Sequence, residues 1–309
     1  MRKIKYILLT LIIILFIINI DIVIDSCKTS LVLFINKVFV CVFPFVILSD
    51  ILLYYDYHIF LQRVFGKYIS KLFNIDPSVS IIFILSIFTA SPTNSIYIKD
   101  MLDNKQIDTY TAQRILSFTY FSSIPFVIGT IGITLFKSFK IGLILYILML
   151  IHNVMIGILL RNDNTSYNPN KMAIIKDKNI FVVLKKSILK AIESSLIILG
   201  NLIIFTIVTN IILKYINLSD ITTSILCGLL EITNGIVKVS NLNINIIYKV
   251  LLTSFLLNFS SLSILFQSFS ILNNYNINIK KILMIRLVFS IISLIEAFIT
   301  ITYIIMPIF

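Results

Sequence analysis

The chain has 309 residues, of which 58% are hydrophobic and only 13% charged, and its mean hydropathy is +1.02. A soluble fold of this size would expose a very large apolar patch, so the composition excludes a soluble protein and indicates one that lies in a lipid bilayer. The formal net charge of +12 would suit nucleic acid, but the basic residues cluster between apolar runs, so we expect no nucleic-acid partner.

Seven apolar runs are long enough to cross a bilayer, which takes about 20 helical residues for a hydrocarbon core about 30 Å thick. They span residues 6–24, 31–54, 115–136, 141–160, 188–213, 247–272 and 282–306. Two further runs, residues 79–90 and 221–232, are too short. Lipid admits only backbone whose hydrogen bonds are satisfied internally, and the runs lack the alternation of a barrel, so the sequence predicts an all-α polytopic membrane protein.

The basic residues give the orientation of these helices. They cluster at residues 2–5, 63–71, 161–190 and 280–286, and the positive-inside rule places all four clusters in the cytoplasm. Residues 21–30, residues 137–140 and the C-terminus are then outside. This scheme admits about seven crossings, because a crossing by either short run would move a basic cluster outside. We therefore expect the two short runs to be re-entrant half-helices.

The crossings divide the chain into an N-terminal helix and two repeats. Residues 1–30 are expected to form a transmembrane helix, because Asn19, Asp21 and Asp25 stand where a signal peptide would have a small-residue cleavage site. Residues 31–160 and 188–309 each hold three crossings and one re-entrant segment, and a cytoplasmic linker at residues 161–187 joins them. An odd number of crossings inserts the second repeat upside down, which is the inverted repeat of secondary transporters.

Polar residues interrupt the apolar sequence at matching places in both halves. The first tip (residues 89–95) holds Ser91, Thr93, Asn94 and Ser95, and the second tip (residues 231–235) holds Glu231, Thr233 and Asn234. Each tip is followed by Phe-Ser-Ser in the next apolar run, which supplies Ser122 and Ser123 in the first half and Ser260 and Ser261 in the second. Broken hydrophobic segments at corresponding positions indicate the binding site of a transporter. We therefore expect these side chains to bind substrate, with both tips meeting near the membrane midplane.

The local chemistry of the tips suits an anion. Pro92 removes a backbone donor, and we expect Thr93, Asn94 and Ser95 to cap a restarted helix whose N-terminus would bind a carboxylate. At the second tip Gly235 permits an unwound backbone. The alternative is that the tip residues are ordinary caps at loop ends and that the paired serines are packing residues of membrane helices.

Ionisable side chains inside apolar runs are costly and are therefore functional candidates. Glu231, beside the second tip, is the strongest of them. We expect Glu193 to pair with Lys190, Asp50 to be solvated near the cytoplasmic end, and Glu296 to find an internal partner in the last span.

The sequence carries no pattern that indicates catalysis or a metal. Cys27, Cys41 and Cys227 are far apart and lack CxxC spacing, so neither a disulfide framework nor a zinc site is expected. His58 and His152 are the only histidines, and His152 is interpreted as a hydrogen-bonded residue of the interior. Because G-x-S-x-G, H-E-x-x-H and Walker motifs are missing, we expect a protein that is not an enzyme and needs no cofactor.

Several segments follow one another in the order of a known family. Residues 42–52 read V-F-P-F-V-I-L-S-D-I-L, residues 90–96 A-S-P-T-N-S-I, residues 228–236 G-L-L-E-I-T-N-G-I and residues 257–263 L-N-F-S-S-L-S. These resemble V-F-P-x-L-x-P-F-F-I-x-S-E-L-L, G-Y-P-x-G-A-K, G-L-L-E-I-T-N-G and L-S-F-G-G-L-S of the YlbJ sporulation integral membrane proteins, which carry two nucleoside-recognition, or gate, repeats. The resemblance spans about residues 31–306. Ala90, Asn94, Ser260 and Ser261 stand where that family has glycine, and Ile96 stands where it has lysine.

The resemblance implies a more specific function than the residues alone. The family occurs in endospore-formers, is similar to a stage V sporulation protein of the outer forespore membrane, and is linked to delivery of dipicolinic acid, a small planar dianion. It implies a transporter of a small organic anion, with a second copy of the chain or other sporulation membrane proteins as candidate partners. A nucleoside or other small-solute carrier, and a non-transporting membrane scaffold of spore assembly, stay open as alternatives.

Overall fold

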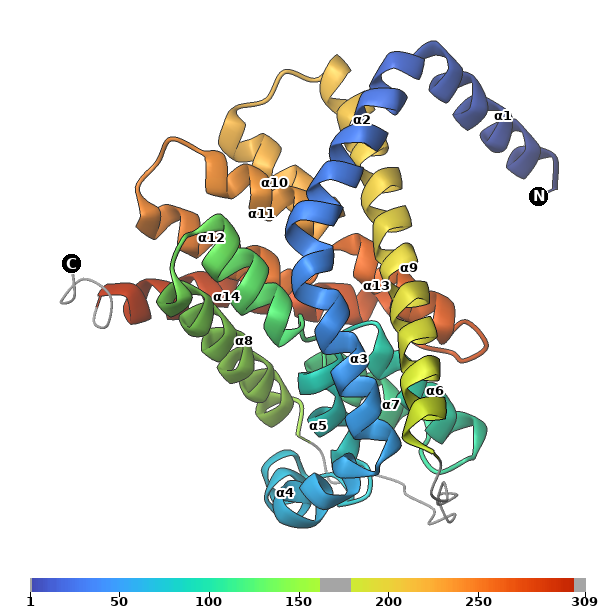
Figure 1. Cartoon of the computed structure of the whole chain (residues 1–309), viewed down its shortest axis with the longest axis vertical. Helices are drawn as coiled ribbons and strands as arrows, with labels where there is room; N and C mark the ends of the chain where they lie inside the picture. The colour runs from blue at the N-terminus through green and yellow to red at the C-terminus, as the bar shows by residue number, and fades with distance from the viewer. Residues whose placement is uncertain (1, 162–178, 303–309) are drawn as a thin grey trace.

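The computed structural model describes residues 2–161 and 179–302, and these residues form helices and connecting loops without a strand (Figure 1). The helices are α1 (Arg2–Ile18), α2 (Ile20–Leu33), η1 (Phe34–Phe39), α3 (Val40–Tyr54), α4 (Tyr57–Phe73), α5 (Ser80–Thr89), α6 (Thr93–Asp103), α7 (Thr109–Phe118), η2 (Pro125–Leu135), α8 (Phe139–Leu159), α9 (Ile180–Tyr215), α10 (Asp220–Leu230), α11 (Ile232–Asn241), α12 (Ile246–Phe259), α13 (Leu262–Ile271) and α14 (Ile279–Thr300). The all-α architecture is confirmed. Most of the expected linker, residues 162–178, lies outside the described residues.

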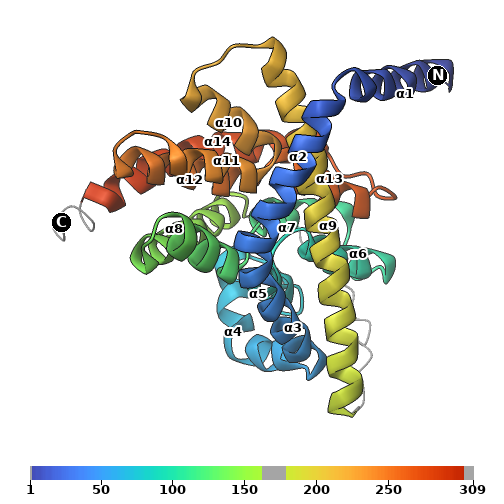
Figure 2. The same ribbon diagram turned by 45° about the horizontal axis from the view of Figure 1, so that its top comes forward.

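Two long helices run side by side along one side of the molecule. α2, the π-helical η1 and α3 form one continuous helix of 35 residues, Ile20–Tyr54, and α9 has 36 residues. Figures 1 and 2 show these two helices side by side, and α9 contacts α2, η1 and α3. At 1.5 Å per residue each is roughly 50 Å long, against a hydrocarbon core of about 30 Å, so each crosses obliquely or extends beyond the membrane.

The first bend in the chain lies at Asn19, not at residues 21–30. Residues 21–30 belong to α2 and continue into the segment Ile20–Tyr54, so the expected separation of two crossings at residues 21–30 is wrong. Asn19 is buried, and its side-chain oxygen accepts a hydrogen bond from Lys214 Nζ of α9 at 2.7 Å. α1 ends at this bend and projects away from the other helices (Figure 1), which divides the apolar run of residues 6–24.

Four helices are interrupted inside apolar sequence. The interruptions are residues 90–92 between α5 and α6, residues 119–123 between α7 and η2, Glu231 between α10 and α11, and residues 260–261 between α12 and α13. Pro92 and Pro125 account for the first two, because proline lacks the N–H and its ring collides with the carbonyl four residues earlier. Two of these breaks were expected as tips, and the other two fall in the paired Phe-Ser-Ser segments.

Five helical segments of the described chain are long and apolar enough to cross a membrane, in place of the seven expected. They are Ile20–Tyr54, Phe139–Leu159, Ile180–Tyr215, Ile246–Ile271 and Ile279–Thr300. The two missing crossings are residues 6–24, which bend at Asn19, and residues 115–136, which are broken at residues 119–123. α5 and α10 are short apolar helices of 10 and 11 residues, as expected for half-helices. The chain is a polytopic membrane protein.

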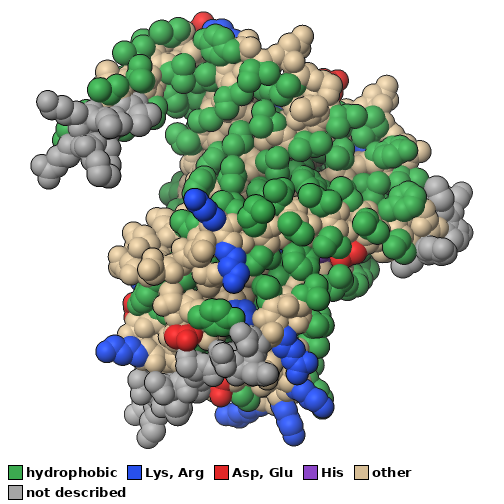
Figure 3. Space-filling view, turned by 180° about the vertical axis from the view of Figure 1, so that it is seen from behind, with side chains coloured by type: hydrophobic (Ala, Val, Ile, Leu, Met, Phe, Trp, Pro, Cys, Tyr) green, Lys and Arg blue, Asp and Glu red, His purple; other side chains and the backbone are tan. Residues whose placement is uncertain are grey.

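The order of elements recurs in the two halves. The first half runs through the broken helices α5–α6 and α7–η2 to α8, and the second through α10–α11 and α12–α13 to α14. α8 packs against η2 and α7 of its own half and also against α12 and α14, so the last helix of the first half is in contact with the second half. Figure 3 shows hydrophobic side chains over the middle of the rear face, with Lys and Arg gathered toward the lower end, near α4 and the start of α9.

Candidate functional site at the helix breaks

The two breaks of the first half are bonded to each other. The Ser91 N–H donates to Phe121 O at 2.8 Å, and Asn94 Nδ2 donates to Thr119 O at 3.0 Å and to Thr119 Oγ1 at 3.1 Å. The side-chain oxygen of Asn94 and the hydroxyl of Ser95 are buried without a hydrogen-bond partner among the described residues. α6 begins at Thr93, so Thr93, Asn94 and Ser95 form its first turn and do not cap it, contrary to expectation.

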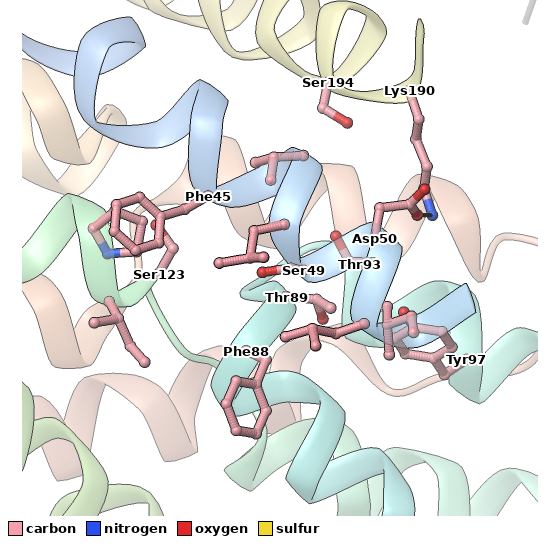
Figure 4. Close-up of a pocket in the computed structure, with 16 residues that line it drawn as sticks. Phe45, Ser49, Asp50, Phe88, Thr89, Thr93, Tyr97, Ser123, Lys190 and Ser194 are labelled. Atoms are coloured by element: carbon pink, nitrogen blue, oxygen red, sulfur yellow. Dashed lines mark hydrogen bonds and ion pairs between the residues drawn. The ribbon is translucent and has the colours of Figure 1, made fainter. Parts of the chain in front are cut away.

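A cavity of about 260 Å³ lies beside these breaks (Figure 4). α3, the α5–α6 break, the start of η2 and α9 supply its walls, and two expected site residues, Thr93 and Ser123, line it. Ser49 and Thr89 add hydroxyl groups, and Figure 4 shows them close to Thr93 in the middle of the cavity. Its volume is slightly below the roughly 300–1,000 Å³ of pockets for drug-sized ligands, so it suits a solute of about one ring.

An ion pair lies at the edge of this cavity. Lys190 of α9 bonds to Asp50 of α3, and Ser187 Oγ donates to the same carboxylate at 2.8 Å. The expected pairing of Lys190 with Glu193 is therefore wrong, and Asp50, whose side chain is only 15% exposed, is not freely solvated. Because the Lys190 side chain is 52% exposed, the pair is worth little to stability. It does place one cation and one carboxylate beside the cavity.

At the second tip Glu231 caps α11. Its carboxylate accepts a hydrogen bond of 2.8 Å from the Asn234 N–H, as an N-cap residue does. Asn234 Nδ2 donates to Thr206 Oγ1 of α9, and Ser30 Oγ of α2 donates to the same hydroxyl at 3.0 Å. The second tip is thereby fastened to the two long helices.

Gly235 serves close packing and not an unwound backbone. It lies inside α11, and no described glycine has a positive φ. A Cβ added at Gly235 would lie 2.1 Å from the Gly228 Cα of α10. The two glycines therefore let α10 and α11 cross in near contact on either side of Glu231, which corrects the expected role of Gly235.

A fully buried arginine connects breaks of the two halves. Arg286 of α14 donates through Nη1 to Asn153 Oδ1 of α8 at 2.9 Å and through Nη2 to Asn258 O and, at 3.2 Å, to Ser260 Oγ. Its guanidinium lies over the ring of Tyr120, 5.4 Å from the centroid. All of these partners are neutral, and no carboxylate in the described chain is within ion-pair distance of Arg286.

The other expected site residues are distributed over these networks. The Ser122 N–H points at Met149 Sδ at 3.4 Å, Ser260 belongs to the Arg286 network, and Ser261 is buried with no side-chain partner among the described residues. Thr233 is buried in the first turn of α11. The hydrogen bonds of each tip stay within its own half, so a meeting of the two tips at the midplane stays a prediction.

Three residues at the breaks adopt conformations that favour glycine. Ala90 has φ 60° and ψ 171°, Ser261 has φ 55° and ψ 152°, and Ser260 has φ 72° and ψ 14°. The first two lie in a region that is almost restricted to glycine, and such residues cost about 1–3 kcal/mol each. The resembling family has glycine at these three positions; it also has glycine at the position of Asn94, which here lies in the first turn of α6 without a positive φ.

The sequence did not identify Arg286, Asn153, Asn258 and Tyr120 as site residues. Arg286 was counted with the cytoplasmic cluster of residues 280–286, yet it lies two turns inside α14 and is fully buried. The signal that could have found it is local, since Met284, Ile285, Leu287 and Val288 surround it with apolar sequence.

Helices that break inside apolar segments, with polar side chains and a buried cation at the breaks, characterise this polytopic membrane protein. Over 138 residues the chain is 22% identical to the sporulation integral membrane protein YlbJ of Bacillus subtilis (strain 168). The match covers 45% of this chain and 34% of that relative, about a third of its length. It confirms the resemblance carried by the motifs. No protein-family model and no solved structure matches the chain.

Proposed function

We propose that this chain is a sporulation membrane protein that carries a small organic anion through the membrane, with dipicolinate as the solute and the outer forespore membrane as its location. The name of the Bacillus subtilis relative supports a role in sporulation. The broken helices support transport, because irregular backbone at membrane depth is tolerated where it lines a cavity or is buried in protein.

Arg286 is the observation that carries the choice of an anion. Taking a cation out of water costs several kcal/mol, and an opposite charge usually compensates it. The hydrogen-bond partners of Arg286 are neutral, so its positive charge favours an anionic solute over a neutral or cationic one. The segment at residues 119–123 links this cation to the cavity, since Tyr120 lies under the guanidinium and Ser123 lines the cavity.

The test is uptake of radiolabelled dipicolinate by liposomes that contain only this purified protein. Thr93→Val and Ser123→Ala each remove one hydroxyl from the cavity, and a hydrogen bond to a charged group is worth about 1.5–3 kcal/mol, so uptake should fall about tenfold or more. Thr10→Val is the matched control, because Thr10 is exposed on α1 and bonds only to Tyr6 O of its own helix.

Competition separates the alternatives. Inhibition by unlabelled pyridine dicarboxylates, with no effect of uridine, supports the anion carrier. Inhibition by uridine, together with uptake of labelled uridine, would favour a nucleoside carrier. The third outcome is that the inserted protein moves neither solute, although spores that lack the protein contain less dipicolinate. This outcome would favour the membrane scaffold over the carrier.

A further inference from the structure

A second buried polar pair joins the two halves, away from the cavity. His152 of α8 and Glu296 of α14 face each other, with 3.3 Å between His152 Nδ1 and Glu296 Oε2. The His152 side chain is fully buried, and that of Glu296 is 16% exposed. The Phe289 ring lies edge-on to the imidazole, 5.8 Å between centroids. Both residues lie in segments long and apolar enough to cross the membrane.

Each member of the pair has one polar atom left over. His152 Nε2 and Glu296 Oε1 are buried without a hydrogen-bond partner among the described residues. With Glu296 ionised, the Nδ1–Oε2 contact is a hydrogen bond only if Nδ1 carries the imidazole proton, because a carboxylate only accepts hydrogen bonds. That proton leaves a lone pair on Nε2. The pair then has a net charge of −1 and can accept one more proton.

No other charged group on the surrounding helices forms a hydrogen bond or ion pair with His152 or Glu296 among the described residues. Arg286 acts electrostatically on the imidazole from earlier in α14, and its hydrogen bonds go to Asn153, Asn258 and Ser260. Arg114 of α7 bonds to Phe73 O and Asn74 O, Lys249 of α12 to Ser240 O, and Tyr146 of α8 to Ile87 O. Exposed side chains are those of Arg63, Lys67 and Lys71 on α4, Lys140 on α8, Tyr248 on α12, and Lys280 and Lys281 on α14.

We propose that His152 and Glu296 form a proton-binding site that couples movement of the anion to entry of a proton. This inference rests on the proposed function. A proton from water adds to His152 Nε2, and no other bond is made or broken. The pair becomes an imidazolium beside a carboxylate, and its net charge changes from −1 to zero. Buried ionisable groups in membrane segments are typical of such relays.

The position of the pair links proton binding to conformation. His152 belongs to the first half and Glu296 to the second, so any movement of one half against the other changes the Nδ1–Oε2 contact. A proton that binds one arrangement better shifts the population toward it, and by linkage the arrangement changes the affinity for the proton. Proton entry with the anion also offsets part of the negative charge that is carried.

The first experiment measures uptake of labelled dipicolinate by liposomes with and without an inward proton gradient. For one coupled proton, a gradient of one pH unit raises accumulation by up to about tenfold. His152→Gln and Glu296→Gln should abolish this stimulation while exchange of internal for external dipicolinate, which needs no net proton movement, continues. His58→Gln is the matched control, since His58 of α4 is the only other histidine, and it should keep the stimulation.

The second experiment is independent of transport. In His58→Gln protein labelled with nitrogen-15 histidine, the only imidazole signal comes from His152. We expect this signal to move with pH between about pH 5 and pH 9, and the titration to change in the same protein with Glu296→Gln. A signal that does not respond to pH, or one that is indifferent to Glu296→Gln, overturns the proton site. Uptake by the wild type without any effect of the gradient overturns the coupling. Failure of dipicolinate uptake with a titrating pair would count against the proposed function and leave the proton site standing.

Discussion

Arg286 Nη1 donates a hydrogen bond of 2.9 Å to Asn153 Oδ1, and this contact joins α14 of the second half to α8 of the first. Asn153 Nδ2 in turn donates to Tyr120 O at 3.0 Å, in the break at residues 119–123. The other end of the guanidinium reaches Asn258 O, beside the break at residues 260–261. One side chain therefore holds a break of each half in a fixed relation.

Replacing Arg286 should lower the free energy of unfolding, because its buried hydrogen-bond acceptors lose their donor. Arg286→Met leaves Asn153 Oδ1 and Asn258 O without this donor, and a buried group without a partner costs about 1–3 kcal/mol. Arg286→Lys keeps the charge but cannot reach both oxygens, so it should lie between Met and the wild type. The measurement is thermal unfolding in detergent. Lys281→Met, on the exposed first turn of α14, is the control and should change the free energy of unfolding by less than about 0.5 kcal/mol.

Glycine should stabilise two of the breaks. Ala90 and Ser261 have positive φ in a region almost restricted to glycine, so Ala90→Gly and Ser261→Gly relieve strain of about 1 kcal/mol or more each. Ala191→Gly is the control with the opposite sign, because Ala191 lies inside α9, where glycine costs about 1 kcal/mol. The measurement is the melting temperature, which should rise in Ala90→Gly and Ser261→Gly and fall in Ala191→Gly. If Ala90→Gly lowered the melting temperature as Ala191→Gly does, the backbone at residue 90 would not be as described.

The sequence was sufficient for the membrane class and for the location of the first and second tips. Composition alone decides that helices are buried in lipid, and Pro92 within a polar stretch marks the first break, whereas Pro44 lies inside the continuous helix Ile20–Tyr54. The break at residues 119–123 was interpreted as serines within a helix, although Pro125 carries the same signal as Pro92.

Other features depend on partners that are distant in the sequence. Residues 21–30 were expected outside the membrane between two crossings, but α2 continues through them and packs on α9, where Ser26 and Ser30 bond to Asn210 and Thr206. The burial of Arg286 depends on Asn153, 133 residues away. The close approach of Gly228 and Gly235 depends on how α10 and α11 cross, which hydrophobic periodicity does not specify.

A methyl group at Gly235 should disrupt the second tip. The added Cβ would lie 2.1 Å from the backbone of Gly228, so α10 and α11 must separate and the Glu231 cap must move. Such overpacking costs typically about 1–3 kcal/mol, and here the neighbour is backbone that cannot rotate away. Gly200→Ala is the matched control. A Cβ at Gly200 meets nothing within 4 Å, and alanine favours the helix by up to about 1 kcal/mol. Equal stability of Gly235→Ala and Gly200→Ala would contradict the contact between α10 and α11.

Cysteine labelling should place Lys105 and Asn276 on one face of the membrane and Lys137 on the other. The loops that hold the first two positions lie together, since Tyr275 OH bonds to the Asp103 carboxylate and the Asn278 N–H donates to Gln113 Oε1 at 2.9 Å. Each position is replaced singly by cysteine in a chain that lacks Cys27, Cys41 and Cys227, and a membrane-impermeant maleimide is applied to vesicles of both orientations. The chain without cysteine is the control for background labelling.

The outcome at Lys137 tests the re-entrant nature of α10–α11. Between Lys137 and Asn276 the described residues hold three segments long enough to cross, which are Phe139–Leu159, Ile180–Tyr215 and Ile246–Ile271. Three crossings put the two positions on opposite faces, provided that α10–α11 returns to the face it came from. Labelling of both positions from the same face would require an even number of crossings, either because α10–α11 also crosses or because the broken segment α12–α13 does not. In either case the scheme of three crossings with a re-entrant α10–α11 between these positions would be wrong.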